Sequence, residues 1–447
     1  MKHEFRTASE APISEIEIRS LVDNFLSYKH RYEKLEDYYT AKHRAILAVN
    51  KDTGIPNNKI INAYPKYITD VQTGYFMGQP VSYSADDGAE DVLEKLQVVF
   101  DYNDEQAENA ELAKSASVCG RSFELLYADA DGNARFTCVS PTEMFQVLDT
   151  SVENNIVCAI RTYAYKLYDG SVIKYVQCYD KYSTRYFEYD EQGFRLVDEQ
   201  PNYFGDVPIV VYENNSESMG DFEHVLTEID AYDKEQSNTL NDMEQFSDAY
   251  LVFKNLLGTE DEDIIKMRKR KLILLDETGS AEWLIKDVND TWIENFKTRL
   301  KNDIHKFSGT PDLTDENFGS NLSGVSLRYK LLAMEQIRST KERYFKKGLQ
   351  RRIELLCNFL RITTNIGDYT KINMKFNNML PQNLLEASQI VGNLAPYLSK
   401  ETLLSLLPFV ENAKEEIEKK EKEDLESSNA SYNALMTSQN DDKTQQG

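Results

Sequence analysis

Two groups of carboxylates in this sequence have the composition of a divalent-cation site. Glu260-Asp261-Glu262-Asp263 places four acids in succession, and oxygen ligands of this kind hold Mg²⁺ in phosphoryl chemistry. Asp129-Ala130-Asp131-Gly132 begins like a calcium-binding loop, but glycine stands at the fourth rather than the sixth position and Ser140 replaces the bidentate glutamate. Because 75 of the 447 residues are acidic, such clusters arise from composition alone. A solvated face and a hairpin turn are the favoured interpretations.

The residues that usually carry nucleophilic or phosphate-binding chemistry are not arranged for it. None of the patterns G-x-x-x-x-G-K-[ST], G-x-G-x-x-G, G-x-S-x-G and H-E-x-x-H occurs, and the five histidines are scattered singly. The five cysteines are widely spaced without a C-x-x-C pair, which argues against a disulfide framework and a thiolate zinc site. That usage favours synthesis in a reducing cytoplasm. The sequence predicts no enzyme and no metal or cofactor site.

Basic residues gather in two places. The run from Lys266 to Lys271 could contact phosphates, although the four acids just before it favour a subunit contact or a solvated turn. The segment 325–361 holds ten bases and three acids in an otherwise acidic chain. Either it is a solvated or inter-subunit face that pairs with the acids of segment 228–257, or it faces phosphates. The first interpretation is favoured, because repeated copies in a ring would give the opposite charges partners.

The overall composition is that of a folded, strongly acidic protein. Hydrophobic residues make up 41% and charged residues 28%, and the formal net charge is −24, which would repel a polyanion unless the charges are segregated. No apolar stretch is long enough to span a membrane, and the basic start lacks the apolar region of a signal peptide. We therefore expect neither a membrane protein nor a secreted one, and a conventional nucleic-acid binder is disfavoured.

The periodicity of apolar residues predicts an α+β protein. Helices are expected in 13–50 and 88–118, and an antiparallel meander in 119–215, where Tyr-, Val- and Ile-rich runs alternate with turns. One helix of about thirty residues should run to Leu257, followed by a small α/β insert.

The second half of the chain continues with long helices. A second helix, opened by Thr291 and Glu294 as a capping box, should end at Ser308-Gly309. An acidic loop to Gly324 separates it from the basic helix 325–361, and a strand at 372–376, two short helices and a solvated acidic helix follow.

The order of these parts resembles the portal proteins of tailed bacteriophages, of the kind found in long-tailed phages of Gram-positive hosts. The resemblance covers about residues 15–425, and no single motif carries it. The segments that do so are Asn57 to Tyr67 with Gly74-Tyr75-Phe76-Met77-Gly78-Gln79-Pro80, Pro208-Ile209-Val210 with Asn214-Asn215, Asp248-Ala249-Tyr250-Leu251, Asp315-Glu316-Asn317-Phe318-Gly319, and Ser323-Gly324-Val325-Ser326-Leu327-Arg328-Tyr329-Lys330-Leu331.

The resemblance implies a portal fold with a function for each part. Its parts would be the wing of helices and antiparallel sheet, 1–220; a stem helix, 221–257; a small α/β clip, 258–289; a second stem helix, 290–308; the tunnel loop, 309–324; a long helix and strand returning to the wing, 325–382; a helical crown, 383–426; and a flexible tail, 427–447. The tunnel-loop residues that would face DNA are Asp312, Asp315, Glu316, Asn317, Phe318 and Asn321. The clip residues that would dock partners are Lys266, Arg268, Lys269, Arg270, Lys271 and Trp283.

The resemblance also implies the assembly and its partners. Copies would close into a homo-oligomeric ring, a dodecamer in the mature particle, at one vertex of the virion capsid, after synthesis in the bacterial host cytoplasm. Double-stranded DNA would pass through without sequence specificity. The terminase motor, head–tail adaptor proteins, and capsid and scaffolding proteins would be partners, with no membrane contact and no cofactor.

Two other functions remain open from the residues alone. A metal-dependent phosphohydrolase built on the acidic clusters would turn over nucleotides or DNA with Mg²⁺. A soluble adaptor unrelated to virions would be a monomer or a dimer. Only the portal interpretation requires a large ring.

Overall fold

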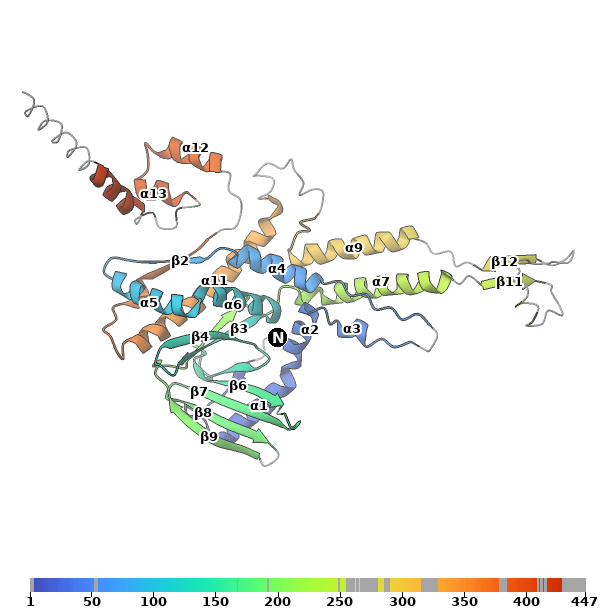
Figure 1. Ribbon diagram of the computed structural model, residues 1–447, viewed down its shortest axis with the longest axis horizontal. Coiled ribbons are helices and arrows are strands. Elements are labelled where there is room, and N and C mark those ends of the chain that lie inside the picture. The colour runs from blue at the N-terminus through green and yellow to red at the C-terminus, as the bar shows by residue number, and fades with distance from the viewer. Residues whose placement is uncertain are drawn as a thin grey trace, which may run out of the picture.

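The computed structural model describes most of the chain as an elongated molecule. The described residues are 4–51, 55–166, 168–190, 193–247, 250–254, 280–284, 290–314, 329–377, 384–407 and 416–427, together with Glu262, Ile265, Val410 and Ala413. Figure 1 shows a body of sheets and helices, an arm of two helices that projects from it, and a small helical group set apart. Helices and antiparallel sheets form separate parts, so the predicted α+β class is confirmed.

The N-terminal helices pack onto the body rather than lying on its surface. Ser14 caps the first helix by accepting a hydrogen bond from the Glu17 backbone N–H. Ile18 and Phe25 on this helix, and Leu35 on the next, are fully buried, whereas Ile16 on the opposite side is 84% exposed. One or two surface helices were expected here, and instead three form, two of them with a buried stripe. They are α1 (Glu15–Tyr28), α2 (His30–Tyr39) and α3 (Arg44–Leu47).

A six-stranded sheet lies against these helices. Its strand order is β1-β5-β6-β7-β8-β9, and all neighbours are antiparallel except β1 and β5. Phe5 and Phe25 pack on Phe145, with ring centroids 4.5 Å apart in both pairs, and join the sheet to α1. The strands are β1 (Phe5–Arg6), β5 (Met144–Leu148), β6 (Ile156–Lys166), β7 (Val172–Asp180), β8 (Ser183–Asp190) and β9 (Gly193–Pro201).

A second, three-stranded sheet shows that segment 119–215 is not one meander. Its order is β10-β3-β4, and β10 reaches back across the intervening strands to pair Val211 with Phe123. The predicted single meander was wrong because this pairing is non-local, and local alternation does not reveal it. The predicted helical pair covers this sheet. The elements are β3 (Arg121–Ala128), β4 (Ala134–Val139), β10 (Ile209–Glu213), α5 (Glu90–Asn103) and α6 (Glu105–Cys119).

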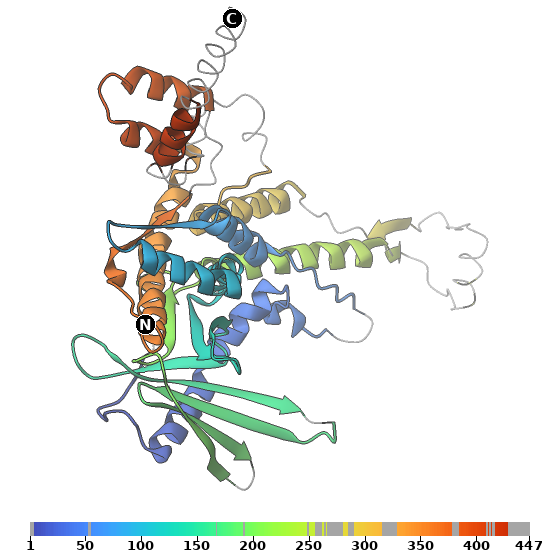
Figure 2. The ribbon, with the colours of Figure 1, turned by 60° about the vertical axis from the view of Figure 1, so that its left-hand side comes forward.

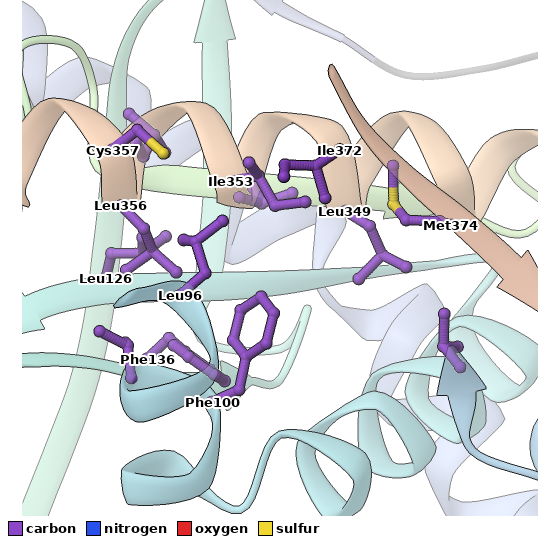
Figure 3. Close-up of a cluster of buried hydrophobic side chains, with 14 of the residues drawn as sticks. Leu96, Phe100, Leu126, Phe136, Leu349, Ile353, Leu356, Cys357, Ile372 and Met374 are labelled. Carbon is purple, nitrogen blue, oxygen red and sulfur yellow. The ribbon is translucent and has the colours of Figure 1, made fainter. Parts of the chain in front are cut away.

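The largest hydrophobic core lies between this sheet and a long helix, α11 (Leu332–Leu360). Figure 3 shows Leu349, Ile353 and Leu356 of α11 pointing toward Leu96 and Phe136 from the opposite side. The predicted strand at 372–376 is confirmed as β13 (Ile372–Phe376), which pairs with β2 (Val81–Ala85). The basic helix thus packs a largely apolar side onto the body, although Arg352 and Lys341 are also buried there.

Two antiparallel helices form the projecting arm. They are α7 (Leu226–Ser247), which follows the short 3₁₀ turn η1 (Glu223–Val225), and α9 (Asp290–Ser308). At about 1.5 Å per residue, the 22 residues of α7 extend roughly 33 Å. Both views show the helices side by side with a β-hairpin at their far end, β11 (Tyr250–Lys254) and β12 (Ser280–Leu284) (Figures 1 and 2). The helix predicted to continue to Leu257 therefore ends ten residues earlier, at Ser247.

The C-terminal part is helical and largely exposed. The two short helices predicted after Pro381 are confirmed as α12 (Leu384–Leu394) and α13 (Lys400–Ser405), and Ser399 caps α13. Residues 416–427 are also helical, and nearly all are exposed, as expected for a solvated acidic helix. Tail residues 428–447 lie outside the described part. Among the described helices, none combines the length and apolarity needed to cross a bilayer.

Candidate functional site

The hairpin at the end of the arm carries the segment in which partner-docking residues were predicted. Tyr250 pairs with Leu284 next to the helices, and Lys254 pairs with Ser280 at the far end of the described strands. Of the six predicted docking residues, only Trp283 falls within a described strand, where its backbone pairs with Leu251. The other five lie outside the described residues: Lys266, Arg268, Lys269, Arg270 and Lys271. The described strands of the hairpin thus lie at the end of the arm away from the body.

The opposite end of the arm leads into the predicted acidic loop. Helix α9 ends at Ser308 as predicted, and Gly309 follows with φ of +64°, a left-handed conformation that favours glycine. The His224 ring donates from Nε2 to the Phe307 carbonyl at 2.7 Å, which ties the end of α9 to the start of α7. The His305 ring donates from Nδ1 to the Thr310 carbonyl at 2.9 Å. One imidazole therefore satisfies a carbonyl of the last helical turn, and the other satisfies a carbonyl of the segment that follows the helix.

Helix α4 (Tyr64–Met77) holds the first residues of this loop. The Tyr67 hydroxyl donates to the Pro311 carbonyl at 3.0 Å and accepts the Leu313 backbone N–H at 3.0 Å. One turn further along α4, the buried Gln72 amide donates to the Thr310 hydroxyl at 3.0 Å. Hydrogen bonds between Tyr67 and the backbone at 311 and 313 thus fix the loop base. Helix α4 thereby sets the direction in which the chain leaves α9.

Asp312 is the one predicted loop residue that the structure describes. Lys301 on α9 lies 2.7 Å from its Oδ2 atom, and the Thr314 hydroxyl and backbone N–H both donate to its Oδ1 atom. Burial alone would raise the pKa of the Asp312 carboxyl, but the hydrogen bonds from Lys301 and Thr314 outweigh burial and lower this pKa to about 2. Asp312 is therefore a charged, paired group at the base of the loop. The other predicted loop residues lie outside the described residues: Asp315, Glu316, Asn317, Phe318 and Asn321.

The charge of helix α11 is largely satisfied inside the same subunit. Arg352 is fully buried, and its Nε atom donates to Glu124 at 3.0 Å, while Nη1 donates to Glu105 at 3.0 Å and to Asn109 at 2.8 Å. Its Nη2 atom lies 2.6 Å from a Glu124 oxygen as an ion pair without hydrogen-bond geometry. Burial would lower the Arg352 pKa, but the two carboxylates and Tyr212 raise it, so the guanidinium stays charged.

Three further bases of α11 are paired in the same way. Lys341 is buried and donates to Asp221 at 2.5 Å, Arg351 donates to Asp206 at 2.6 Å, and Arg338 pairs with Glu335 of its own helix at 2.9 Å. Both interpretations of this helix as an outward-facing basic surface were wrong for Arg352 and Lys341. The reason is that their partners come from elements far away in sequence. The exposed bases of this helix in the described residues are Arg343, Lys346 and Lys347.

One buried pair has the composition of a catalytic dyad. The His43 Nδ1 atom lies 2.5 Å from Asp233 Oδ2, both side chains have no exposure, and Tyr38 stacks on the imidazole. Asp233 also accepts hydrogen bonds from the backbone and side chain of Asn62, both at 2.8 Å. Because no solvent or substrate reaches this imidazole, the pair serves to fasten α3 and the Asn62 segment to the arm. Among the described residues no group of three or more His, Cys, Asp or Glu is placed to hold a metal ion.

The sequence did not reveal the residues of α4 that fix the loop. Tyr67 ends a segment that was noted for its family resemblance, and Gln72 lies just outside it, but no spacing rule connects either residue to Pro311 or Thr310. The available signal was the Tyr64-Pro65-Lys66-Tyr67 order: helical spacing places Tyr64 and Tyr67 on one side of a helix. Both rings contact the His305 ring edge to face, at 5.9 and 5.7 Å.

Comparison with known proteins finds one family and two relatives. Residues 18–430 match a family model described as "Phage portal protein, SPP1 Gp6-like". The chain is 24% identical over 411 residues to the "Portal protein" of Bacillus phage SPP1, covering 88% of this chain and 80% of that protein. It is 22% identical over 429 residues to the "Portal protein" of Clostridium phage phiCD119, covering 89% of this chain and 93% of that one. The matched region includes the arm, the loop base and α11.

Proposed function

Because the chain belongs to the SPP1 Gp6-like family of phage portal proteins, we propose that twelve copies close into a ring at one vertex of the virion capsid. Portal proteins are structural components of the virion, they assemble as oligomeric rings, and their channel serves DNA packaging; these properties come with the family. The match across residues 18–430 is the observation that carries the proposal. Among the three functions considered from the sequence, it favours the portal over the phosphohydrolase and the non-viral adaptor.

Within the ring, each part of the chain has an assigned place. The wing comprises 1–220, the stem 221–257 and 290–308, the clip 258–289, the tunnel loop 309–324, the return to the wing 325–382, and the crown 383–426. The antiparallel arm of α7 and α9 supports a stem, and the hairpin of β11 and β12 supports a clip at its tip. The left-handed turn at Gly309 and the hydrogen bonds from Tyr67 support a loop that leaves the stem at a fixed point.

The distribution of charge supports a conduit rather than a binding protein. A DNA duplex carries one negative charge per ~1.7 Å of its length, and a wall of free bases would bind it by releasing counterions. Arg352 and Lys341 of the most basic helix are neutralised by buried carboxylates of their own subunit, and the chain as a whole carries −24. DNA is therefore held in the channel by confinement, without sequence specificity, and keeps its mobility.

The partners follow from the two ends of the arm. The clip, with Lys266, Arg268, Lys269, Arg270, Lys271 and Trp283, meets the terminase motor during packaging and the head–tail adaptor proteins afterwards. The wing meets capsid and scaffolding proteins. Assembly takes place in the cytoplasm of the bacterial host before the virion is complete.

Reversal of loop charge tests this function. The variant Asp315→Lys with Glu316→Lys is compared with Asp198→Lys with Glu199→Lys, which makes the same change of charge on the exposed strand β9. Both variants should form rings of wild-type mass. Only the loop variant should slow DNA packaging, because new bases in the narrowest part of the channel would attract the duplex. Wild-type packaging by the loop variant at low salt would contradict the charge argument, and a wild-type protein that remains monomeric would contradict the ring.

A further inference from the structure

The two helices of the arm carry complementary charge patterns, acidic on α7 and basic on α9. On α7, Glu228, Glu235 and Asp242 recur every seven residues. The stripe on α9 consists of Lys306, Arg299 and Trp292, which are also seven residues apart. This order runs from the end of α9 toward its start, because α9 is antiparallel to α7. Seven residues of helix rise about 10.5 Å, nearly two turns, so each set forms a stripe along one side of its helix.

The basic stripe lies on the open side of α9, and the acidic stripe lies at the partly exposed edge of α7. Ile229 of α7 and Ile304 of α9 are fully buried, which identifies the side of each helix that packs onto the rest of the subunit. Arg299 and Lys306 are exposed, Trp292 is 62% exposed, and Glu228 and Glu235 are half-buried. In the described part of the subunit, neither Glu228 nor Glu235 forms an ion pair with Arg299 or Lys306. The arm thus presents an acidic side and a basic, aromatic side to its surroundings.

The two stripes also lie at matching heights. The hydrogen bond from His224 to the Phe307 carbonyl places the start of α7 beside the end of α9, and the pair Tyr250 and Leu284 joins the other ends. Glu228 on α7 and Lys306 on α9 both lie within about one helical turn of the contact between His224 and Phe307. Glu235 and Arg299 lie about 10.5 Å further along their helices, again at a common height. A rotation about a ring axis along the arm keeps every residue at its height, so the stripes of adjacent copies would face each other in register.

We propose that the basic stripe of α9 docks on the acidic stripe of α7 in the next copy of this chain, and that this contact closes the stem of the ring. The inference rests on the proposed ring and adds the residues that join its subunits. Trp292, stacked on Phe296 with ring centroids 5.7 Å apart, supplies the apolar end of the contact. Tryptophan and arginine are the residue types that most often dominate such interfaces. The seam is heterologous, because different surfaces meet, and it can therefore repeat around a ring.

A charge-swap experiment tests the seam. Variant A carries Arg299→Glu with Lys306→Glu, variant B carries Glu228→Lys with Glu235→Lys, and variant AB carries all four changes. The control, Lys174→Glu with Lys181→Glu, makes the same charge change as variant A at two exposed positions, one on β7 and one in the turn after it. Ring mass and the protein concentration needed for assembly are measured by native mass spectrometry and electron microscopy. Circular dichroism and thermal melts confirm that each subunit is folded.

We expect variants A and B to lose ring assembly in part, and variant AB to recover it. Exposed ion pairs contribute modestly, so variants A and B should each need roughly tenfold more protein to assemble, and less so at high salt. Variant AB and the control should assemble like the wild type, and Trp292→Ala should weaken assembly at all salt concentrations. The seam is refuted if A and B assemble normally, or if AB is no better than either.

Three further outcomes would each overturn the seam for a different reason. Normal rings of variant A with altered DNA packaging would show that the basic stripe faces the channel, which would overturn the seam but keep the proposed function. A wild-type protein that forms no ring would overturn both. If A or B fails to fold and AB also fails to fold, these charges stabilise the fold of their own subunit, and the seam is refuted.

Discussion

The Tyr67 hydroxyl is the most direct link between helix α4 and the base of the loop, and its removal gives the sharpest prediction. Tyr67→Phe deletes one hydrogen bond to the Pro311 carbonyl and one from the Leu313 N–H. The ring stays, so its edge-to-face contact with His305 at 5.7 Å is retained. Each lost hydrogen bond costs about 1 kcal/mol net, and water can replace part of it because Leu313 is exposed. The expected loss is therefore about 1–2 kcal/mol, confined to the loop base.

Hydrogen exchange measures this loss locally. A loss of 1–2 kcal/mol raises the population of the opened loop base roughly five- to thirtyfold, and exchange of the Leu313 amide should accelerate by the same factor. The matched control is Tyr39→Phe, which removes a hydroxyl that donates to Asp70 at 2.9 Å and does not touch the loop. It should leave exchange at Leu313 unchanged. Wild-type exchange at Leu313 in Tyr67→Phe, or acceleration spread evenly over α4 and α9, would refute the assignment of Tyr67 as the residue that positions the loop.

Three further substitutions test the packing and the electrostatics. Alanine in place of Gly348 would put a Cβ closer to the Tyr212 ring than van der Waals contact allows, so Gly348→Ala should lower the free energy of unfolding by about 1–3 kcal/mol. Gly392 lies in open space on α12, so Gly392→Ala should raise the free energy of unfolding by up to ~1 kcal/mol. Equal denaturation midpoints for the two variants would contradict this prediction. Because the Asp312 pKa is lowered from 3.8 to about 2, its contribution to stability is present above pH 4 and is lost as the pH falls toward 2. Lys301→Met should raise this pKa toward 3.8 in an NMR titration, and an unchanged titration would exclude Lys301 as a cause.

Local signals in the sequence predicted much of the fold. The helical periodicity of α9 and its glycine stop at Gly309 are confirmed, as are the strand 372–376 and the helical pair α5 and α6. These elements depend on neighbouring residues: the spacing of apolar side chains, a capping residue and a left-handed turn. By contrast, the run Tyr250-Leu251-Val252-Phe253 continues the helical spacing of α7 yet forms a strand. Its partner, β12, begins at Ser280, and no periodicity within the run reveals that pairing.

The same contrast applies to the charges. Composition and motif content determined that the chain is acidic and that it lacks the usual catalytic patterns, and the order of its segments determined the family. Only the tertiary structure decided that Arg352 meets Glu124 and Glu105, and that Tyr67 holds the loop base. A buried charge must find a partner wherever the fold brings one, and these partners are more than two hundred residues away. Composition and periodicity record what each segment contains, whereas the partner of a charge depends on which segments the packed core brings together.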